Sequence, residues 1–327
     1  MTAARSDGYV PLVSVIIVNY NGLRFIRPLF QSLLAQTYPR MEILLFDNGS
    51  TDGSAGYVKS HFQQVRVIEL AENRGFSRPN NEGIKDSSGE YVLTLNVDVI
   101  LERDFLKQLV NVLVSDSTIG WVSGKILKLT PTGKSKEIDC LGHHFHRDRY
   151  AKETDHSQPF RWADYSKPRQ VFGASACAAL YRRTMLEDVS FDGEYFDEDF
   201  VSYWEDVDLD WRANQRGWRC LYTPKAVAYH MRGGTGLYRT PEFAARYLAN
   251  RFLIILKNDD LEYLLQDMGP FAKRVLIDFY LSLKRCPIAL PISLKFFLQK
   301  IPITLVKRDR IRRSRRVPKA YIRSLTR

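Results

Sequence analysis

The sequence predicts an α/β fold, in which a mainly parallel sheet is flanked by helices and followed by a C-terminal helical extension. In the first hundred residues, strand-like apolar runs alternate with segments whose apolar residues recur at helical spacing. The run LVSVIIV (12–18) has no polar alternation, which is typical of a strand buried on both faces of a parallel sheet. After residue 258 the composition changes to amphipathic and then basic segments.

The expected elements follow in a regular order. Ser77 is placed to cap the third helix, and a helix starting near Glu205 is expected to stop at Gly217. The alternation of strands and helices implies parallel strands that are joined by right-handed crossovers. Strands are expected over 12–18, 41–46, 65–70, 91–95, 120–129 and 226–229, and further helices over 23–36, 53–62, 77–86, 101–115 and 240–257.

Polar residues follow each of the first four strands. One such cluster is ordinary turn chemistry, but parallel strands end at one edge of the sheet, where four clusters together form a site. A carboxylate at the end of the 91–95 strand can hold a hard divalent cation, which in turn can hold a diphosphate. The clusters are Asn19/Asn21, Asp47/Asp52, Asn73/Gly75 and Asn96/Asp98.

Composition sets further bounds. The chain has 327 residues and 45% hydrophobic content, enough for one large domain or two smaller ones. Its four cysteines form no C-x-x-C pair, which suggests a reduced, cytosolic setting. Residues 1–10 are expected to be flexible, and Met1–Tyr9 lacks the apolar core of a signal peptide. No apolar run is expected to span a membrane.

Taken as an ordered set, eight motifs make the chain resemble a family 2 glycosyltransferase with the GT-A fold, close to the rhamnosyltransferase-like branch. The resemblance covers roughly residues 11–255. It implies an inverting hexosyltransferase that moves a sugar from a nucleoside-diphosphate sugar to a hydroxyl of a glycan or lipid-linked glycan, in cell-envelope polysaccharide assembly. The motifs are VSVIIVNYNG (13–22), FDNGSTDGS (46–54), ENRGF (72–76), NNEGI (80–84), LNVDV (95–99), FGASACAALYRR (172–183), WEDVDLDWRANQRGW (204–218) and AYHMRGGTG (228–236).

The resemblance also implies roles for individual residues on the donor side. Asp98 is the second acid of a D-x-D motif and would bind a Mg²⁺ or Mn²⁺ ion that carries the diphosphate, with His230 completing the metal shell or touching the phosphates. Asn96 stands where the first acid is expected and is a possible further ligand. The residues expected to bind the donor nucleotide are Asn19, Tyr20, Asn21, Asp47, Asn73, Gly75, Arg78 and Asn80.

On the acceptor side, the resemblance makes Asp206 the general base that takes the proton of the acceptor hydroxyl. Gly173 and Ala174 would lie against the donor sugar, and Trp204 and Glu205 beside the donor sugar or acceptor. The run from Asp197 to Asp210 is rich in acids, and such concentrated negative charge requires a nearby cation or proton.

A polar, aromatic segment over 130–168 resembles an acceptor-side insertion. It contains Cys140, His143, His144 and His146, but their spacing matches no standard zinc site. A surface loop is the expected structure. The glycines of 233–236 would let a second loop close over the donor.

The net charge of +11 is concentrated at the C-terminus. Residues 300–327 contain eleven Lys or Arg and one acid, so they carry all but one of the net positive charges. We expect a catalytic domain over 11–257, with a donor half (11–129) and an acceptor half (130–257), and an extension over 258–327. Its segment 271–327 is predicted to bind an anionic membrane surface, peripherally on the cytoplasmic face.

Alternatives remain at this point. The extension can instead be a helical cap with a solvated tail. The tail could bind nucleic acid, although 307–327 offers only Tyr321 for base stacking, which makes this function less favoured. A nucleotidyltransferase should carry an early glycine-rich phosphate loop, which is missing here; the G-x-G-x-x-G pattern of nicotinamide and flavin enzymes is missing too. Asn96 keeps open an inactive glycosyltransferase-like scaffold.

Overall fold

The computed structural model describes residues 9–153, 165–232 and 240–327, so the predicted flexible residues 1–8 and glycine loop 233–236 lie outside the described part. The strands are β1 (Val13–Asn19), β2 (Met41–Asp47), β3 (Val65–Glu69), β4 (Tyr91–Asn96), β5 (Val99–Leu101), β6 (Ile119–Thr130), β7 (Gly133–Cys140), β8 (His144–Phe145), β9 (Ala151–Lys152), β10 (Arg169–Val171), β11 (Ala178–Arg182) and β12 (Arg219–His230). The helices are α1 (Leu23–Leu34), α2 (Ser54–His61), α3 (Ser77–Lys85), α4 (Phe105–Ser115), α5 (Arg183–Val189), the short 3₁₀ helix η2 (Glu198–Phe200), α6 (Glu205–Gln215), α7 (Pro241–Asn258), α8 (Leu261–Gln266), α9 (Met268–Arg285), α10 (Ala289–Ser314) and α11 (Lys319–Ser324).

The predicted parallel sheet is confirmed. The strand order is β10-β12-β6-β11-β4-β1-β2-β3, and β1 to β4 pair in parallel. Asn19 lies opposite Asp47, and Val18 lies opposite Asn96, so the strand ends meet at one edge as expected. Beyond β4 the sheet becomes mixed, because β11 runs antiparallel to both β4 and β6.

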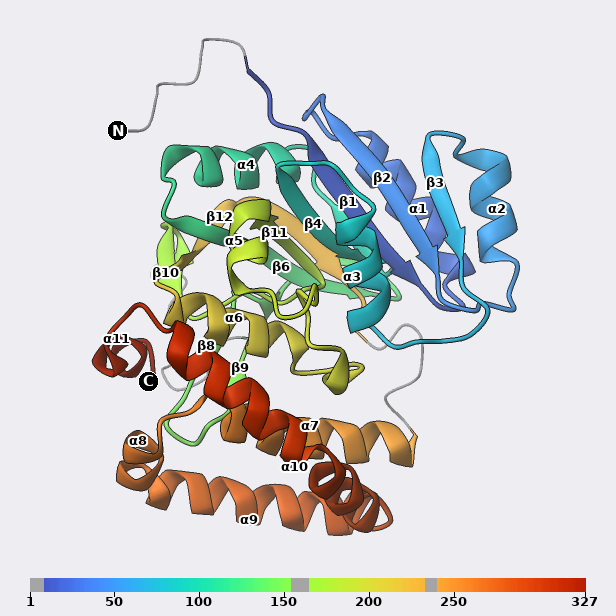
Figure 1. The fold of residues 1–327 in the computed structure, drawn as a ribbon. Coiled ribbons are helices and arrows are strands. Elements are labelled where there is room, and N and C mark those ends of the chain that lie inside the picture. Colours follow the sequence, from blue (N-terminus) through green and yellow to red (C-terminus); the bar gives the residue numbers. More distant parts are fainter. Residues whose placement is uncertain (1–8, 154–164, 233–239) are drawn as a thin grey trace.

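Alternating side chains of the buried strands enter two cores. Val15 and Ile17 of β1 pack with the apolar faces of α1, α2 and α4, while Ile16 packs on the other side with residues of α3, α5 and α6. A third, aromatic cluster joins the segment around β8 to α6 and α7 through residues that include Phe145 and Trp211. Helices therefore cover both faces of the sheet (Figure 1).

Two local predictions were wrong. Ser77 is the first residue of α3, whereas Phe76 holds the cap position, and the buried Ser77 hydroxyl has no hydrogen-bond partner among the described residues. The described part of 130–168 is not a surface loop: β7 pairs with β6, and four side chains are buried because this segment packs over the sheet and α6. These side chains are Cys140, His143, His144 and His146.

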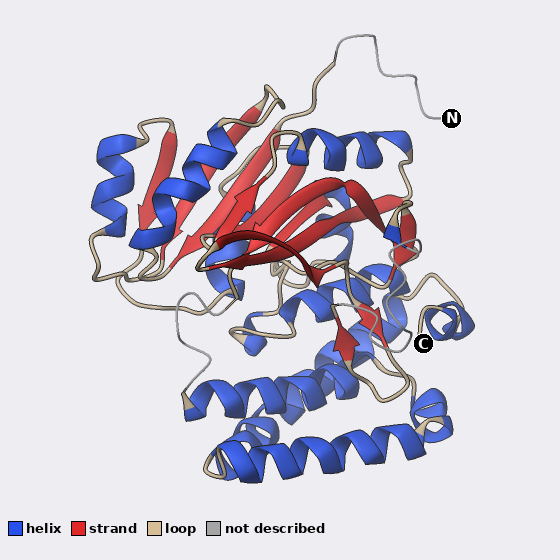
Figure 2. Cartoon of the chain, turned by 180° about the vertical axis from the view of Figure 1, so that it is seen from behind, coloured by secondary structure: helices blue, strands red, loops and turns tan. Residues whose placement is uncertain are grey.

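The C-terminal helices form a layer on the side of the sheet toward which β1 to β3 point (Figure 1), and the reverse view shows the same arrangement (Figure 2). α10 packs along α7 and continues through Pro302. Phe297 of α10 meets Phe252 of α7 edge-to-face, with ring centroids 6.3 Å apart. The extension thus packs as a helical cap on the α/β domain.

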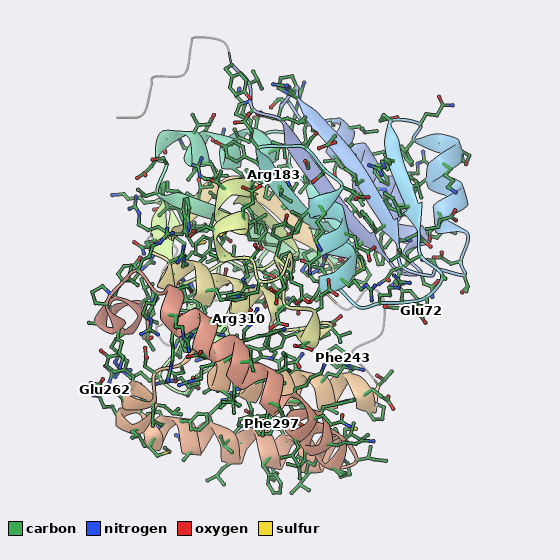
Figure 3. The ribbon with its side chains drawn as sticks, viewed as in Figure 1. Glu72, Arg183, Phe243, Glu262, Phe297 and Arg310 are labelled. Carbon is green, nitrogen blue, oxygen red and sulfur yellow. The ribbon has the colours of Figure 1, made fainter. Side chains whose placement is uncertain are left out.

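The basic residues of α10 neutralise the acid-rich run. Lys307 Nζ lies 2.5 Å from Asp197 and 2.6 Å from Asp199, and Lys300 Nζ lies 2.7 Å from Asp199. Arg310, on the side of α10 that faces the α/β domain (Figure 3), pairs with Asp192 at 2.6 Å. A part of the cationic charge that the concentrated acids require is therefore supplied by the chain's own C-terminal extension.

Candidate active site

A cavity of about 980 Å³ lies at the carboxyl ends of the parallel strands, and Phe243 and Tyr247 of α7 also line it. It is large enough for a nucleotide-sized ligand. Its wall brings together predicted residues that are up to 210 positions apart in the chain, from Tyr20 to His230. The predicted residues that line it are Tyr20, Asn73, Gly75, Asn96, Asp98, Trp204, Glu205, Asp206 and His230.

Asn19 and Asp47 support the cavity from behind. Both are buried, and Asn19 Nδ2 donates to Asp47 Oδ1 at 2.7 Å and to Ser54 Oγ at 2.7 Å. Asn21 Oδ1 accepts the backbone N–H of Thr51 at 2.8 Å. These residues tie the β1 and β2 turns together and are not among the residues that line the cavity.

Arg78 and Asn80 also lie off the cavity wall. The Arg78 side chain is about half exposed and pairs with Glu82 one turn later on α3, at 3.3 Å. Asn80 is buried and donates to the backbone carbonyl of Phe76 at 2.8 Å. The structure therefore assigns both to the stability of α3, whose first turn approaches the cavity through Phe76.

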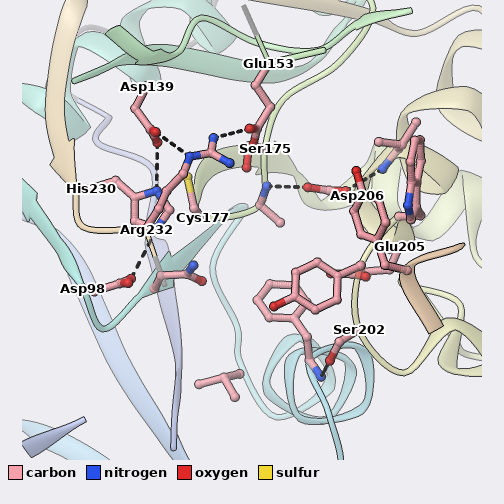
Figure 4. A pocket seen from close by; sticks show the side chains of 18 of the residues that line it. Asp98, Asp139, Glu153, Ser175, Cys177, Ser202, Glu205, Asp206, His230 and Arg232 are labelled. Carbon is pink, nitrogen blue, oxygen red and sulfur yellow. Dashed lines mark hydrogen bonds and ion pairs between the residues drawn. The ribbon is translucent and has the colours of Figure 1, made fainter. Parts of the chain in front are cut away.

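One wall of the cavity carries side chains that can bind a metal ion (Figure 4). Nε2 of His230, at the end of β12, lies 3.3 Å from Asp98 Oδ1, and its Nδ1 lies 2.9 Å from Asp139 Oδ2. Burial alone would lower the pKa of His230, but hydrogen bonds to the two carboxylates outweigh it and raise the pKa to about 9. Asp139 thus fixes the ring so that Nε2 faces Asp98.

The donor atoms suit a hard divalent cation bound together with a ligand. Asp98 offers a carboxylate and His230 an imidazole nitrogen, both of which Mn²⁺ accepts. Within the described ranges, no group of three or more His, Cys, Asp or Glu side chains is arranged to hold a metal by itself. Two protein ligands fit the pattern in which phosphates and water complete the shell.

The opposite wall is formed by the start of α6. Asp206 lies in its first turn, where the helix dipole favours a negative charge. Its Oδ1 accepts the backbone N–H of Val207 at 2.8 Å, and its Oδ2 accepts that of Ala176 at 3.2 Å. About a fifth of the side chain is exposed, toward the cavity. This carboxylate can accept a proton from a bound hydroxyl.

The loop before α6 is strained. Val201, Tyr203 and Trp204 all have a positive φ, between 63° and 74°, which non-glycine residues rarely adopt. Asn250 of α7 holds this loop. Its side-chain Nδ2 lies within hydrogen-bond distance, 2.8 to 3.1 Å, of the backbone carbonyls of Phe200, Ser202 and Tyr203. Such strain persists where the surroundings enforce it, commonly at functional sites.

Two buried polar atoms on this wall have no partner in the described structure, the Trp204 indole N–H and Glu205 Oε2. Burial raises the pKa of Glu205 well above its usual value, and the charge of Asp206 adds to the effect. This environment therefore favours the protonated form of Glu205. Both residues line the cavity and can hydrogen-bond a sugar hydroxyl.

Gly173 and Ala174 are not on the cavity wall; Ser175, Ala176 and Cys177 are. The Asp210 carboxylate fills the space beside Gly173: a Cβ at position 173 would lie 1.7 Å from Asp210 Oδ2, so no side chain fits there. The group that lies against Gly173 is therefore Asp210, whereas the sequence predicted the donor sugar at this position.

Sequence reasoning missed several lining residues, namely Asn48, Asp139, His143, Glu153, Ser175, Cys177 and Arg232. Asn48 lies inside the motif FDNGSTDGS (46–54), and its Nδ2 donates to Asn73 Oδ1 at 3.0 Å. Asp139 and His143 lie in the segment assigned to a surface loop, and only their burial shows their role. Arg232 pairs with Asp139 and Glu153. It follows His230 by two positions in the motif AYHMRGGTG (228–236).

A family model described as glycosyl transferase family 2 matches residues 14–190. The poly-beta-1,6-N-acetyl-D-glucosamine synthase of Staphylococcus aureus (strain COL) is 26% identical over 225 residues, which cover 66% of this chain and 49% of that synthase. The synthase of the same name from Staphylococcus epidermidis is 25% identical over 228 residues and is covered to 49% as well. This chain thus spans about half the length of the curated relatives it matches.

Solved structures share the fold. GalNAc-T7 with UDP, GalNAc and Mn²⁺ aligns with a TM-score of 0.60 and 16% identity, over 77% of this chain and 48% of that chain. The mannosyltransferase PcManGT of Pyrobaculum calidifontis, in complex with GDP-Man and Mn²⁺, aligns with a TM-score of 0.56 and 17% identity, over 94% of this chain and 86% of that chain. These similarities confirm the predicted GT-A fold.

Proposed function

Because the chain belongs to glycosyl transferase family 2, we propose that it is an inverting, metal-dependent glycosyltransferase that moves a sugar from a nucleoside-diphosphate sugar to a hydroxyl of a glycan or lipid-linked glycan. One observation carries the proposal: Asp98 with His230, and Asp206, line opposite sides of one cavity. The relatives named as polysaccharide synthases support a glycan acceptor. The rhamnosyltransferase-like branch stays a prediction.

The nucleoside would lie along the β1–β3 end of the cavity. Tyr20 follows β1 there, and Asn48 bridges the next two turns by donating to Asn73 and to the carbonyl of Gly75 at 2.8 Å. Asp47 would act from behind this wall, since it is held by Asn19. The solved structures of the same fold that contain UDP or GDP-Man support a nucleotide in such a cavity.

Asp98 and His230 would hold the divalent cation, and Asn96 would face it as a neutral neighbour. When bound, the cation would neutralise the negative charge that develops on the departing diphosphate. Asp139 keeps the His230 ring turned toward Asp98 through the 2.9 Å contact at Nδ1. Mn²⁺ in the solved GalNAc-T7 and PcManGT structures supports a divalent cation here.

Asp206 would be the general base. As the acceptor oxygen bonds to the anomeric carbon, its proton passes to the Asp206 carboxylate, and the bond from that carbon to the phosphate oxygen breaks with its electron pair on the diphosphate. Attack from the face opposite the leaving group inverts the anomeric centre and needs no covalent intermediate. Trp204 and Glu205 would hold the sugar hydroxyls with their unpaired polar atoms.

A donor screen tests this function. We expect a nucleoside-diphosphate sugar, presented with Mn²⁺ or Mg²⁺, to raise the unfolding temperature, since a ligand at a hundred times its Kd stabilises by about 2.7 kcal/mol. Chelation of the metal and Asp98→Asn should each abolish most of the shift. The matched control is Asp104→Asn, an exposed aspartate outside the cavity. If a complete panel of nucleotide sugars gives no shift with either metal, the proposal fails.

The extension would hold the enzyme peripherally at a membrane. α9 has no buried residue and exposes a row of apolar side chains, Leu276, Phe279, Tyr280 and Leu283. Among the described residues, α10 is long and apolar enough to span a membrane by length and composition alone, contrary to the expectation from its sequence. Its Lys300 is bound to Asp199, which favours a helix lying on the domain. Lys273, Lys284 and Arg285 beside the apolar row suit anionic lipid.

Vesicle flotation tests this placement. We expect the full chain to float with vesicles containing anionic phospholipid and to lose most of this binding in the double variant Leu276→Glu, Phe279→Glu, because both exposed side chains would meet the bilayer. Val114→Glu, which changes an apolar residue of similar exposure on α4, should float normally. Flotation of the double variant at the wild-type level would reject α9 as the contact.

The basic tail gives little support to nucleic-acid binding. Its charges are used within the chain, as Arg315 pairs with Asp260 at 2.8 Å and Arg323 pairs with Asp267. Phosphate binding would have to break such contacts in addition to displacing counterions.

A further inference from the structure

We propose that His143 is a positioning residue for Asp206: its ring, anchored by Asp210, forms an ion pair that keeps the Asp206 carboxylate aimed at the acceptor hydroxyl. This inference rests on the proposed function of Asp206 as the base. His143 lies in the segment after β7, outside every motif that carries the family resemblance, and Asp210 lies one turn after Asp206 on α6.

The ring of His143 bridges the two aspartates. Its Nδ1 lies 2.6 Å from Asp210 Oδ2, a hydrogen bond, and its Nε2 lies 3.7 Å from Asp206 Oδ2, an ion-pair distance. The side chain is only 3% exposed, while Asp206 is open to the cavity. The ring is therefore held between a fully buried carboxylate and the carboxylate that faces the ligand space.

The backbone on both sides of the ring is fixed. The N–H of His143 donates to the carbonyl of Gly173 at 2.7 Å, and the N–H of Phe172 donates to the carbonyl of His143 at 3.0 Å. Asp210 is fixed as well, since its Oδ1 accepts the N–H of Ala174 at 3.2 Å. Asp210 occupies the space where any side chain at 173 would begin. A pair held this firmly can orient a third group.

The charges around the ring favour its cationic form. Burial alone would lower the pKa of His143, but the Asp206 charge and the bond to Asp210 outweigh it and raise the pKa to about 9. Burial raises the pKa of Asp210, and His143 opposes this effect. The other titratable groups that face His143, Asp206 or Asp210 are Glu153, Glu205, Tyr181 and Cys220.

Asp206 lies in a crowded group of acids. Glu205 and Asp210 lie on the same helix, and a general base must present its carboxylate to the acceptor hydroxyl. Among the described residues, only His143 has a cationic side chain within ion-pair distance of Asp206. Arg232, on the metal side, is engaged by Asp139 and Glu153.

The sign of the pH effect follows. In the wild type, kcat should fall above about pH 9, because His143 then loses its proton and the ion pair with Asp206 is lost. Removal of the anionic Asp210 should move this alkaline limb to lower pH.

The experiment measures kcat, donor KM and unfolding temperature of the full chain from pH 5 to 10. For His143→Gln we expect a loss of at least about tenfold in kcat at pH 7, a donor KM within about twofold of the wild type, and no fall in kcat above about pH 9. Asp210→Asn should move the alkaline limb down. The matched control is His61→Gln, an exposed histidine on α2, which should behave as the wild type.

A second measurement does not depend on the folding of a histidine variant. Nitrogen-15 chemical shifts of the wild-type histidine rings should show two buried imidazolium rings that persist to about pH 9, His143 and His230, of which the His143 ring loses its proton at a lower pH in Asp206→Asn. If no histidine behaves in this way, or if His143→Gln lowers only the unfolding temperature and keeps the fall in kcat above about pH 9, the positioning role is rejected. An inactive wild type, or an active Asp206→Asn, would instead reject the proposed function itself.

Discussion

Replacement of Asp206 by Asn is expected to lower kcat by about 10²- to 10⁴-fold while the donor binds as before. The amide keeps the size of the side chain, and its single oxygen can still accept the N–H of either Val207 or Ala176, but it cannot take the proton of the acceptor hydroxyl. The nucleotide and metal residues lie on other elements and should be unaffected. Steady-state transfer rates and calorimetric donor binding measure the two effects separately.

Asp192→Asn is the matched control for this variant. Asp192 is largely exposed and has a φ of 50°, a conformation that Asn adopts readily, so activity and stability should be close to those of the wild type. Near-normal turnover of Asp206→Asn would remove this residue from the role of base. Loss of donor binding in the same variant would mean that Asp206 contacts the donor instead.

Lys257→Met is expected to lower the free energy of unfolding by about 3–5 kcal/mol. Lys257 is 1% exposed and its Nζ lies 2.6 Å from Asp197 and 2.8 Å from Asp208, the second of which is fully buried on α6. Without the ammonium group, both carboxylates stay buried with less opposing charge. Denaturant titration of the two proteins measures the difference.

Lys319→Met serves as the control for that measurement. Its pair with Glu262 spans 3.9 Å and both side chains are more than half exposed, so its loss should cost less than about 1 kcal/mol. Equal effects of the two substitutions would show that the buried pairs contribute no more than a surface pair. The link between α6, α7 and the acid-rich run would then have to depend on packing alone.

The fold could be predicted because its determinants are local. The apolar run of β1 and the helical spacing in α1 are visible within single windows, and the parallel order follows from their alternation. The strand-end clusters were predicted to meet for the same topological reason, and Asn73, Asn96 and Asp98 do line one cavity.

Side-chain direction could not be predicted from topology. Asn19 and Asp47 come from two strand ends at the same sheet edge, yet they bond to each other, because neighbouring parallel strands place them in register. The partners of the catalytic candidates were beyond reach for another reason: Asp139 and His143 lie 91 and 67 residues from His230 and Asp210 along the chain. No pattern within a window connects such pairs.

The charge of the tail could not reveal its partner either. A run of Lys and Arg is equally suited to lipid, nucleic acid or the chain's own carboxylates. Only the packing of α10 on α7 brings Lys307 to Asp197 and Asp199 and shows that a part of the tail charge is neutralised internally.

A crystal structure with Mn²⁺ and the nucleotide sugar selected by the donor screen would test most directly whether one cavity holds both halves of the reaction. We predict a manganese anomalous peak between Asp98 and His230, the diphosphate bound to that ion, and the anomeric carbon on the side of Asp206. A manganese peak elsewhere, or a donor whose sugar points away from Asp206, would contradict the mechanism.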